Sequence, residues 1–164
     1  PGGKEKGRIG GKPAMIQVEI GEGIHFEHTD ALKQAAEAAV KHAPATEPVE
    51  LTIALEGDER LQQLNRDFLG TDAVTDVLSF PADEFDPDAQ SMYIGDVVIS
   101  FPQAQRQAQK AGYPTLAELQ LLVVHGVLHL LGYDHAEEAQ KRAMWQLQAE
   151  ILAVIGCEIK KLPE

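Results

Sequence analysis

The sequence predicts an α+β fold in which a small mixed four-stranded sheet packs against about five helices. Three observations support this prediction. Short apolar segments interleave with helical patterns in the first hundred residues, helical patterns alone follow, and 164 residues suit a single domain. Hydrophobic residues make up 44% of the chain and charged residues 24%, which excludes a disordered or fibrous protein.

Residues 1–14 are expected to lie outside this fold. They are rich in glycine, carry four basic residues against one acidic residue, and lack the apolar centre of a signal peptide. We expect a disordered leader, added for expression, over residues 1–14 and a single domain over residues 15–164.

Four segments have the alternating or continuous apolar pattern of short strands. They are residues 16–20, 49–55, 77–80 and 94–99. Pro81 is expected to end the third strand, so residues 82–91 are expected to form an acidic loop. Gly95 lies inside the fourth strand, where it predicts either a bulge or an exposed edge strand with Asp96.

Five segments have apolar residues at helical spacing. They are residues 29–42, 58–69, 102–111, 115–131 and 136–155. Thr29 or Asp30 is expected to cap the first of these helices, and Gly70 is expected to end the second. Met144 and Trp145 have the spacing of core residues in the last one.

Charge and composition restrict the possible functions. The formal net charge of −12 disfavours nonspecific binding of a polyanion by the whole surface, so such a substrate needs a local basic patch or a metal. The single cysteine, Cys157, excludes an internal disulfide and a cysteine-rich zinc cluster. No apolar run reaches the roughly 20 residues of a membrane span, so a cytoplasmic location is expected.

Histidines interrupt the apolar helix over residues 115–131. His125 and His129 are four residues apart, which places both imidazoles on one helix face. Gly132 allows the chain to leave the helix in a left-handed conformation, and the reversed chain can return His135 to the other two. The spacing predicts three nitrogen ligands and an open fourth position, as in a catalytic zinc site.

Two other interpretations of this segment are a closed structural zinc site and an apolar helix whose histidines are merely hydrogen-bonded. A closed site lacks an obvious fourth ligand, and Asp134 is more simply expected to orient a ligand imidazole. Zinc proteases with this spacing carry a glutamate base after the first histidine, whereas this chain has Gly126. That glycine is expected to free space beside the metal, and without the glutamate base peptide hydrolysis by the usual route is not expected.

The segment HGVLHLLGYDH at residues 125–135 resembles the signature of the YbeY family of bacterial metal-dependent endoribonucleases, which act in ribosomal RNA maturation. Further matching segments are Leu64-Asn65, Gly70, residues 75–81 (TDVLSFP) and residues 95–100 (GDVVIS). The resemblance implies a small mixed sheet with helices, and a metal held by His125, His129 and His135.

The resemblance also indicates further candidate residues and one departure. The family usually has an arginine immediately before the glycine that ends the second helix, and this chain has Leu69 there. Arg66, one helical turn earlier, either substitutes from the same face or is a solvated surface residue. The other candidate cleft or substrate-binding residues are Asp76, Ser79 and Asp96.

These observations favour a zinc-dependent endoribonuclease that acts in ribosomal RNA maturation and ribosome quality control. Its expected cofactor is zinc, and its expected partners are ribosomal RNA or the ribosome, with a ribosome-associated protein as a further candidate. One alternative is a zinc hydrolase of peptides or small amides. The other is a non-catalytic, ribosome-associated metal-binding module.

Overall fold

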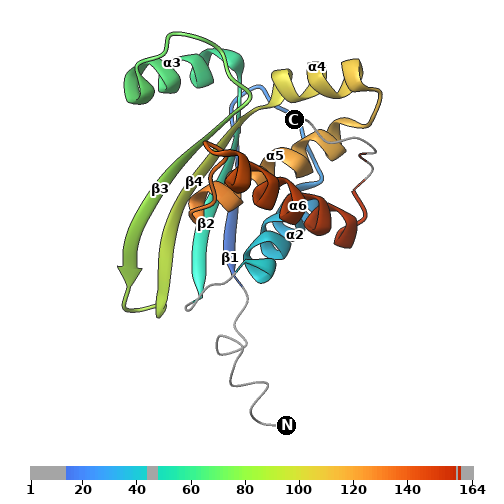
Figure 1. The fold of residues 1–164 in the computed structure, drawn as a ribbon. Coiled ribbons are helices and arrows are strands. Elements are labelled where there is room, and N and C mark those ends of the chain that lie inside the picture. Colours follow the sequence, from blue (N-terminus) through green and yellow to red (C-terminus); the bar gives the residue numbers. More distant parts are fainter. Residues whose placement is uncertain (1–13, 44–47, 158, 160–164) are drawn as a thin grey trace.

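The computed structural model describes residues 14–43, 48–157 and 159. The expected leader of residues 1–14 therefore lies outside the described residues, apart from Ala14. Within the described ranges the chain forms a four-stranded sheet and five helices, which confirms the predicted α+β class (Figure 1).

The sheet contains parallel and antiparallel pairs. Its strands are β1 (Met15–Ile20), β2 (Val49–Glu56), β3 (Val77–Asp86) and β4 (Ser91–Ser100), in the order β1-β2-β4-β3. The pairs β1–β2 and β2–β4 are parallel, and β3 is antiparallel to β4. The interior strands are therefore β2 and β4, and β3 is an edge strand.

The five helices are α2 (Thr29–His42), α3 (Asp58–Leu69), α4 (Phe101–Ala111), α5 (Thr115–Leu130) and α6 (Glu138–Val154). Twelve of the sixteen residues of α5 are buried, because α5 packs on β3 and β4 and also contacts α2, α4 and α6. The helix that carries His125 and His129 is thus the central helix of the fold (Figure 1).

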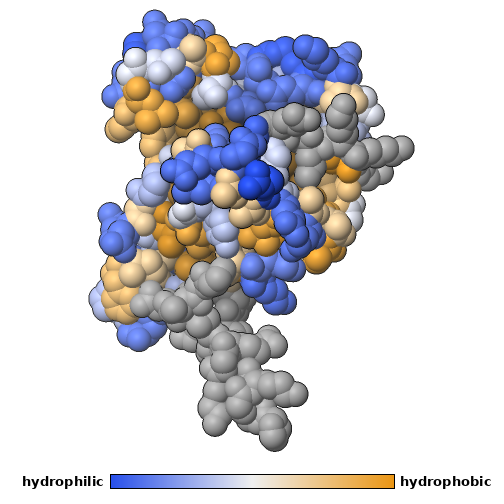
Figure 2. Space-filling model, viewed as in Figure 1, coloured by the Kyte–Doolittle hydropathy of each residue, from blue (hydrophilic) through white to orange (hydrophobic). Residues whose placement is uncertain are grey.

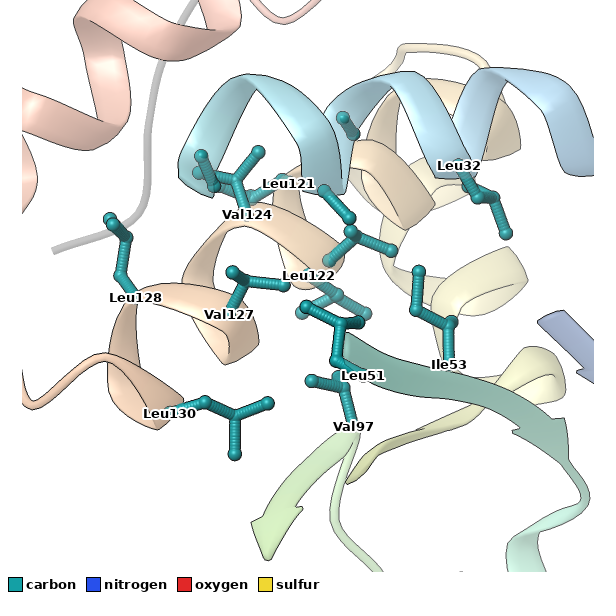
Figure 3. Packing of buried hydrophobic residues seen from close by; sticks show 14 of the residues in the cluster. Leu32, Leu51, Ile53, Val97, Leu121, Leu122, Val124, Val127, Leu128 and Leu130 are labelled. Carbon is teal, nitrogen blue, oxygen red and sulfur yellow. The ribbon is translucent and has the colours of Figure 1, made fainter. Parts of the chain in front are cut away.

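The main core lies between α5 and the sheet. Side chains of α5 lie between α2 and the strands β2 and β4 (Figure 3). Leu51, Ile53 and Val97 contribute the strand side and are at most 1% exposed. The opposite face of the sheet carries a smaller cluster, where Ala54, Leu78 and Val98 pack beneath α3. Successive residues of β4 therefore alternate between the α5 face and the α3 face.

The prediction of an acidic loop over residues 82–91 is wrong, because β3 continues through Pro81 to Asp86 and β4 begins at Ser91. Proline is tolerated here because β3 is an edge strand whose pairing shifts register between Pro81 and Glu84. The acidic side chains of this segment lie along a hairpin.

Two smaller expectations are also corrected. The edge-strand interpretation of Gly95 and Asp96 is wrong because β4 lies between β2 and β3. The bulge interpretation is confirmed by a register shift opposite Gly95, whose φ is +134°. At the start of α2, His28 occupies the cap position with no side-chain cap bond, so neither Thr29 nor Asp30 caps this helix.

Candidate metal centre

The turn after α5 forms as the histidine spacing predicts. The helix ends at Leu130, and Gly132 has a left-handed φ of +103°. The backbone N–H of Gly132 donates to the carbonyl of His129 at 3.0 Å, and that of Tyr133 donates to the carbonyl of Leu128 at 3.0 Å. These bonds satisfy the last carbonyls of α5 while the chain reverses.

The reversal brings three imidazoles together. Ring centroids are 4.7 Å apart for His125 and His129, 5.1 Å for His129 and His135, and 5.7 Å for His125 and His135. One ligand nitrogen from each ring lies within 4.8 Å of the other two. The histidines thus converge on one point from a continuous segment of α5 and its turn.

The cluster favours neutral imidazoles. The pKa of His125 is lowered to about 4, mainly by burial and also by the charges of His129 and His135, against the opposing effects of Gln148 and Asp76. Burial, together with His135, also lowers the pKa of His129. A metal binds the neutral form of the ring. At neutral pH His125 and His129 can therefore bind a metal ion without first losing a proton.

Gln148 of α6 orients His125. Its Oε1 lies 3.0 Å from Nδ1 of His125, and Gln148 is 1% exposed. An amide oxygen only accepts, so Nδ1 carries the ring proton and Nε2 keeps its lone pair for the cluster. Sequence reasoning missed this residue. Its position between Met144 and Ile151 in a core pattern was the available signal, since a buried polar side chain needs a partner.

Trp145 of α6 also contacts the cluster. Its ring centroid is 5.4 Å from that of His125 and 5.6 Å from that of His135. Met144 is fully buried, as expected of a core residue, whereas Trp145 is half-buried and packs against both the core and the histidines. The last helix therefore supplies one side of the histidine cluster.

Asp134 stabilises the turn through the backbone. Its Oδ1 accepts a hydrogen bond from the backbone N–H of His135 at 2.7 Å, and the side chain is exposed. The charge of Asp134 also raises the pKa of His129 against the effect of burial, and its orientation of a ligand imidazole stays a prediction.

Gly126 serves helix packing. A Cβ at this position would lie 2.6 Å from Cγ1 of Val97 and 3.3 Å from Oγ of Ser79. The expectation that Gly126 frees space beside the metal is therefore wrong, because the space is filled by the sheet. Ser79 lies on the same face of the sheet as α5, and its hydroxyl donates to the carbonyl of Gly126 at 3.1 Å.

A buried polar network connects Asp76 to α4 and α5. Nε2 of Gln107 lies 2.6 Å from Oε2 of Glu118 and 3.3 Å from Oδ2 of Asp76. Glu118 is 3% exposed, lies two helical turns before His125, and also accepts from the hydroxyl of Tyr113. Burial raises the pKa of the Glu118 carboxyl, and the charge of Asp76 adds to that shift. The network holds Asp76 at the start of β3, within electrostatic range of His125.

Asp96 lies on the other face of the sheet. It accepts a hydrogen bond from the hydroxyl of Tyr93, whose oxygen lies 2.7 Å from Oγ1 of Thr52 and accepts from that hydroxyl. All three line a hollow of about 640 Å³ between the sheet and α3. The structure therefore separates Asp96 from the histidine cluster, whereas Asp76 and Ser79 lie on the cluster's side of the sheet.

The end of α3 is apolar and exposed where the resembling family usually carries an arginine. Phe68 is 67% exposed and Leu69 is 61% exposed, and Figure 2 shows apolar surface over this helix. Arg66 is also exposed, and its guanidinium lies 3.5 Å from Asp67 and 3.6 Å from Asp72. Arg66 thus behaves as a solvated surface residue with acidic neighbours.

The donor set fits a metal that prefers imidazole. Zinc–nitrogen bonds of about 2.0–2.1 Å separate the ligand nitrogens of a zinc site by roughly 3.4 Å, a spacing within the 4.8 Å limit observed for these three imidazoles. Three neutral imidazoles suit zinc, copper, iron or nickel better than magnesium or calcium, which prefer oxygen. The cluster can therefore hold a divalent transition metal through three protein ligands.

Comparisons with known proteins find relatives over most of this chain. A family model described as "Endoribonuclease YbeY" matches residues 16–156. A protein of that name from Persephonella marina is 44% identical over 121 residues, which cover 73% of this chain and 78% of the relative. One from Chloroflexus aurantiacus is 40% identical over 148 residues, which cover 86% and 95%.

A solved structure has a similar fold. A solution structure of a Thermotoga maritima protein matches with a TM-score of 0.60 and 29% sequence identity, over 86% of this chain and 89% of that one. In the described part of this chain, no helix is both long enough and apolar enough to span a membrane.

Proposed function

This chain belongs to the YbeY family, and from that premise we propose that it is a zinc-dependent endoribonuclease acting in ribosomal RNA maturation and ribosome quality control. Its substrate would be ribosomal RNA or the ribosome, and its place of action the cytoplasm. A ribosome-associated protein is a further partner in this proposal. Residues 15–164 would form the catalytic domain.

One observation carries the proposal. Three imidazole nitrogens lie within 4.8 Å of one another in a chain whose named relatives are endoribonucleases. Three ligands leave a coordination position for water or substrate, which distinguishes a catalytic zinc site from a closed structural one.

In this proposal His125, His129 and His135 hold the metal. When bound, zinc supplies a Lewis acid that polarises a phosphoryl oxygen and lowers the pKa of a bound water. Gln148 keeps Nδ1 of His125 protonated, so that Nε2 is the coordinating atom. Asp134 holds the turn that presents His135.

The remaining candidates have supporting roles. Asp76, held by Gln107 on the cluster's side of the sheet, would lie beside the substrate, and Ser79 would hold α5 against β3. Arg66 shares its charge with two carboxylates, and Asp96 lies on the opposite face of the sheet. Neither therefore supports phosphate binding at the metal.

The test is RNA cleavage by the purified full chain with zinc restored. Structured and single-stranded ribosomal RNA fragments would be incubated with the unsubstituted chain, with His129→Ala, and with His25→Ala, which changes an exposed histidine in a loop. We expect His129→Ala to lose both stoichiometric zinc and cleavage, and His25→Ala to retain both.

Equal cleavage by His129→Ala would indicate a contaminating nuclease and contradict the proposal. Cleavage of casein or model peptides with no effect on RNA would favour a zinc hydrolase of peptides or small amides. Zinc and ribosome binding without turnover of either substrate would favour the non-catalytic binding module.

A further inference from the structure

The indole nitrogen of Trp145 is a buried hydrogen-bond donor with no acceptor among the described residues. Folded proteins rarely leave such a donor unpaired, because its lost bond to water is not replaced. A phenylalanine would provide the same ring packing without that cost. The donor therefore needs a reason beyond packing.

The surroundings of the indole limit where an acceptor can come from. On one side Trp145 packs against the apolar core, which offers no acceptor. On the other it contacts the rings of His125 and His135, and Nδ1 of His125 is engaged by Gln148. A ligand atom held at the histidine cluster is the acceptor that this environment can receive.

We propose that Nε1–H of Trp145 donates a hydrogen bond to a phosphoryl oxygen of the ligand bound at the histidine cluster. This inference rests on the proposed function, in which the metal attracts that oxygen. The donor is enclosed in this structure, so the side chains around it must shift to admit the ligand oxygen, and a base stacked on the outer surface does not reach it. A charged oxygen is favoured because an N–H bond to an anion is stronger than one to a neutral acceptor.

The charge distribution makes a neutral donor useful here. The chain carries a net charge of −12, and the candidate Arg66, on α3, is engaged by Asp67 and Asp72. Arg106 is likewise engaged, at 2.6 Å from Asp58. An indole N–H adds affinity for a phosphoryl oxygen without a basic side chain, and it does not repel the metal.

The test compares the unsubstituted chain with Trp145→Phe, which removes the donor and keeps an aromatic ring. Zinc binding is measured first by calorimetry, and inorganic phosphate binding to the zinc-loaded protein second. We expect similar zinc affinities and phosphate affinity about tenfold weaker in Trp145→Phe, equivalent to ~1.4 kcal/mol. Trp145 is the single tryptophan of the chain, so its fluorescence reports both titrations directly in the unsubstituted protein.

The matched control is Tyr93→Phe, which removes a ring donor on the opposite face of the sheet and should leave phosphate affinity unchanged. A second arm replaces inorganic phosphate with a short 2′-O-methyl RNA. A tenfold loss for both ligands supports a contact with the backbone phosphodiester. A loss for inorganic phosphate alone supports a contact with a free or terminal phosphate.

Equal phosphate affinity in Trp145→Phe would overturn the inference and leave the proposed function standing. Zinc affinity that falls as far as phosphate affinity would also overturn it, because the indole would then act on the histidines and not on the ligand. Failure of the unsubstituted chain to bind zinc would overturn the proposed function itself, and this inference with it.

Discussion

Replacing Gln148 by leucine should weaken metal binding while leaving the fold intact. Gln148 is 1% exposed, and its Oε1 accepts the Nδ1 proton of His125 at 3.0 Å. Leucine has a similar volume and fills the same space, so the main loss is the hydrogen bond. Without an acceptor at Nδ1, His125 can carry its proton on Nε2, the nitrogen that the cluster needs free.

The size of the effect follows from that single bond. Leaving the buried imidazole N–H without its acceptor costs about 1–3 kcal/mol, which corresponds to about 5–150-fold in a binding constant. Partners of metal-binding histidines typically change metal affinity by about 10–100-fold when they are removed, which agrees with this range. We therefore expect Gln148→Leu to bind zinc about 10–100-fold more weakly.

The assay is competition for zinc with a chromogenic chelator at pH 7. Gln146→Leu is the matched control, because it makes the same change two residues away at an exposed position of α6. Circular dichroism confirms that each variant is folded. Zinc affinity of Gln148→Leu equal to that of the control would refute the argument that Gln148 selects the ring nitrogen of His125.

Three further outcomes concern stability. Gly126→Ala should lower the melting temperature in a thermal scan, because overpacking against Val97 costs about 1–3 kcal/mol and exceeds the roughly 1 kcal/mol that alanine adds to helix stability. Without metal, the protein should lose up to about 3 kcal/mol as pH falls from 6.5 to 4, since the pKa of His125 is lowered to about 4 and the unfolded chain binds its proton first; urea unfolding at several pH values measures this. Ser100→Ala should cost about 2 kcal/mol in urea unfolding, because Ser100 caps α4 and also donates to Asp58 at 2.6 Å.

Each outcome has a clear opposite. A higher melting temperature for Gly126→Ala would mean that helix propensity outweighs the contact with Val97. Unchanged stability of the metal-free protein between pH 6.5 and 4 would contradict the lowered pKa of His125. A stability of Ser100→Ala within about 0.5 kcal/mol of the unsubstituted protein would show that the hydrogen bonds of Ser100 do not stabilise the fold.

Much of the fold could be predicted because local patterns reflect local burial. The alternation in residues 49–55 and the helical spacing in residues 115–131 both correspond to observed elements. Pro81 led to a wrong prediction of where the third strand ends. Proline is excluded only from strand positions whose N–H must form a hydrogen bond, and the order of the strands, which decides those positions, cannot be read from the local sequence. The face of the sheet that receives α5 is also nonlocal, so alternation alone did not separate Asp96 from the cluster's side.

In the candidate site, too, local sequence patterns predict some residues and not others. The convergence of His125, His129 and His135 follows from helix geometry and the turn at Gly132, all within eleven consecutive residues. The contacts of Gln148 and Trp145 depend on how α6 docks, which no spacing within α6 specifies. The sequence therefore indicates the proposed ligands but not the side chains that orient and enclose them.

The close approach of α5 to β4 also limits how this fold can change over evolutionary time. A glutamate after the first histidine would make the motif that of a zinc protease, but its Cβ would lie 2.6 Å from a branched side chain in the sheet. A single mutation to that motif would therefore carry a packing cost, because the helix would have to move outward to admit the side chain. Descendants that keep this packing inherit the exclusion of that base along with it.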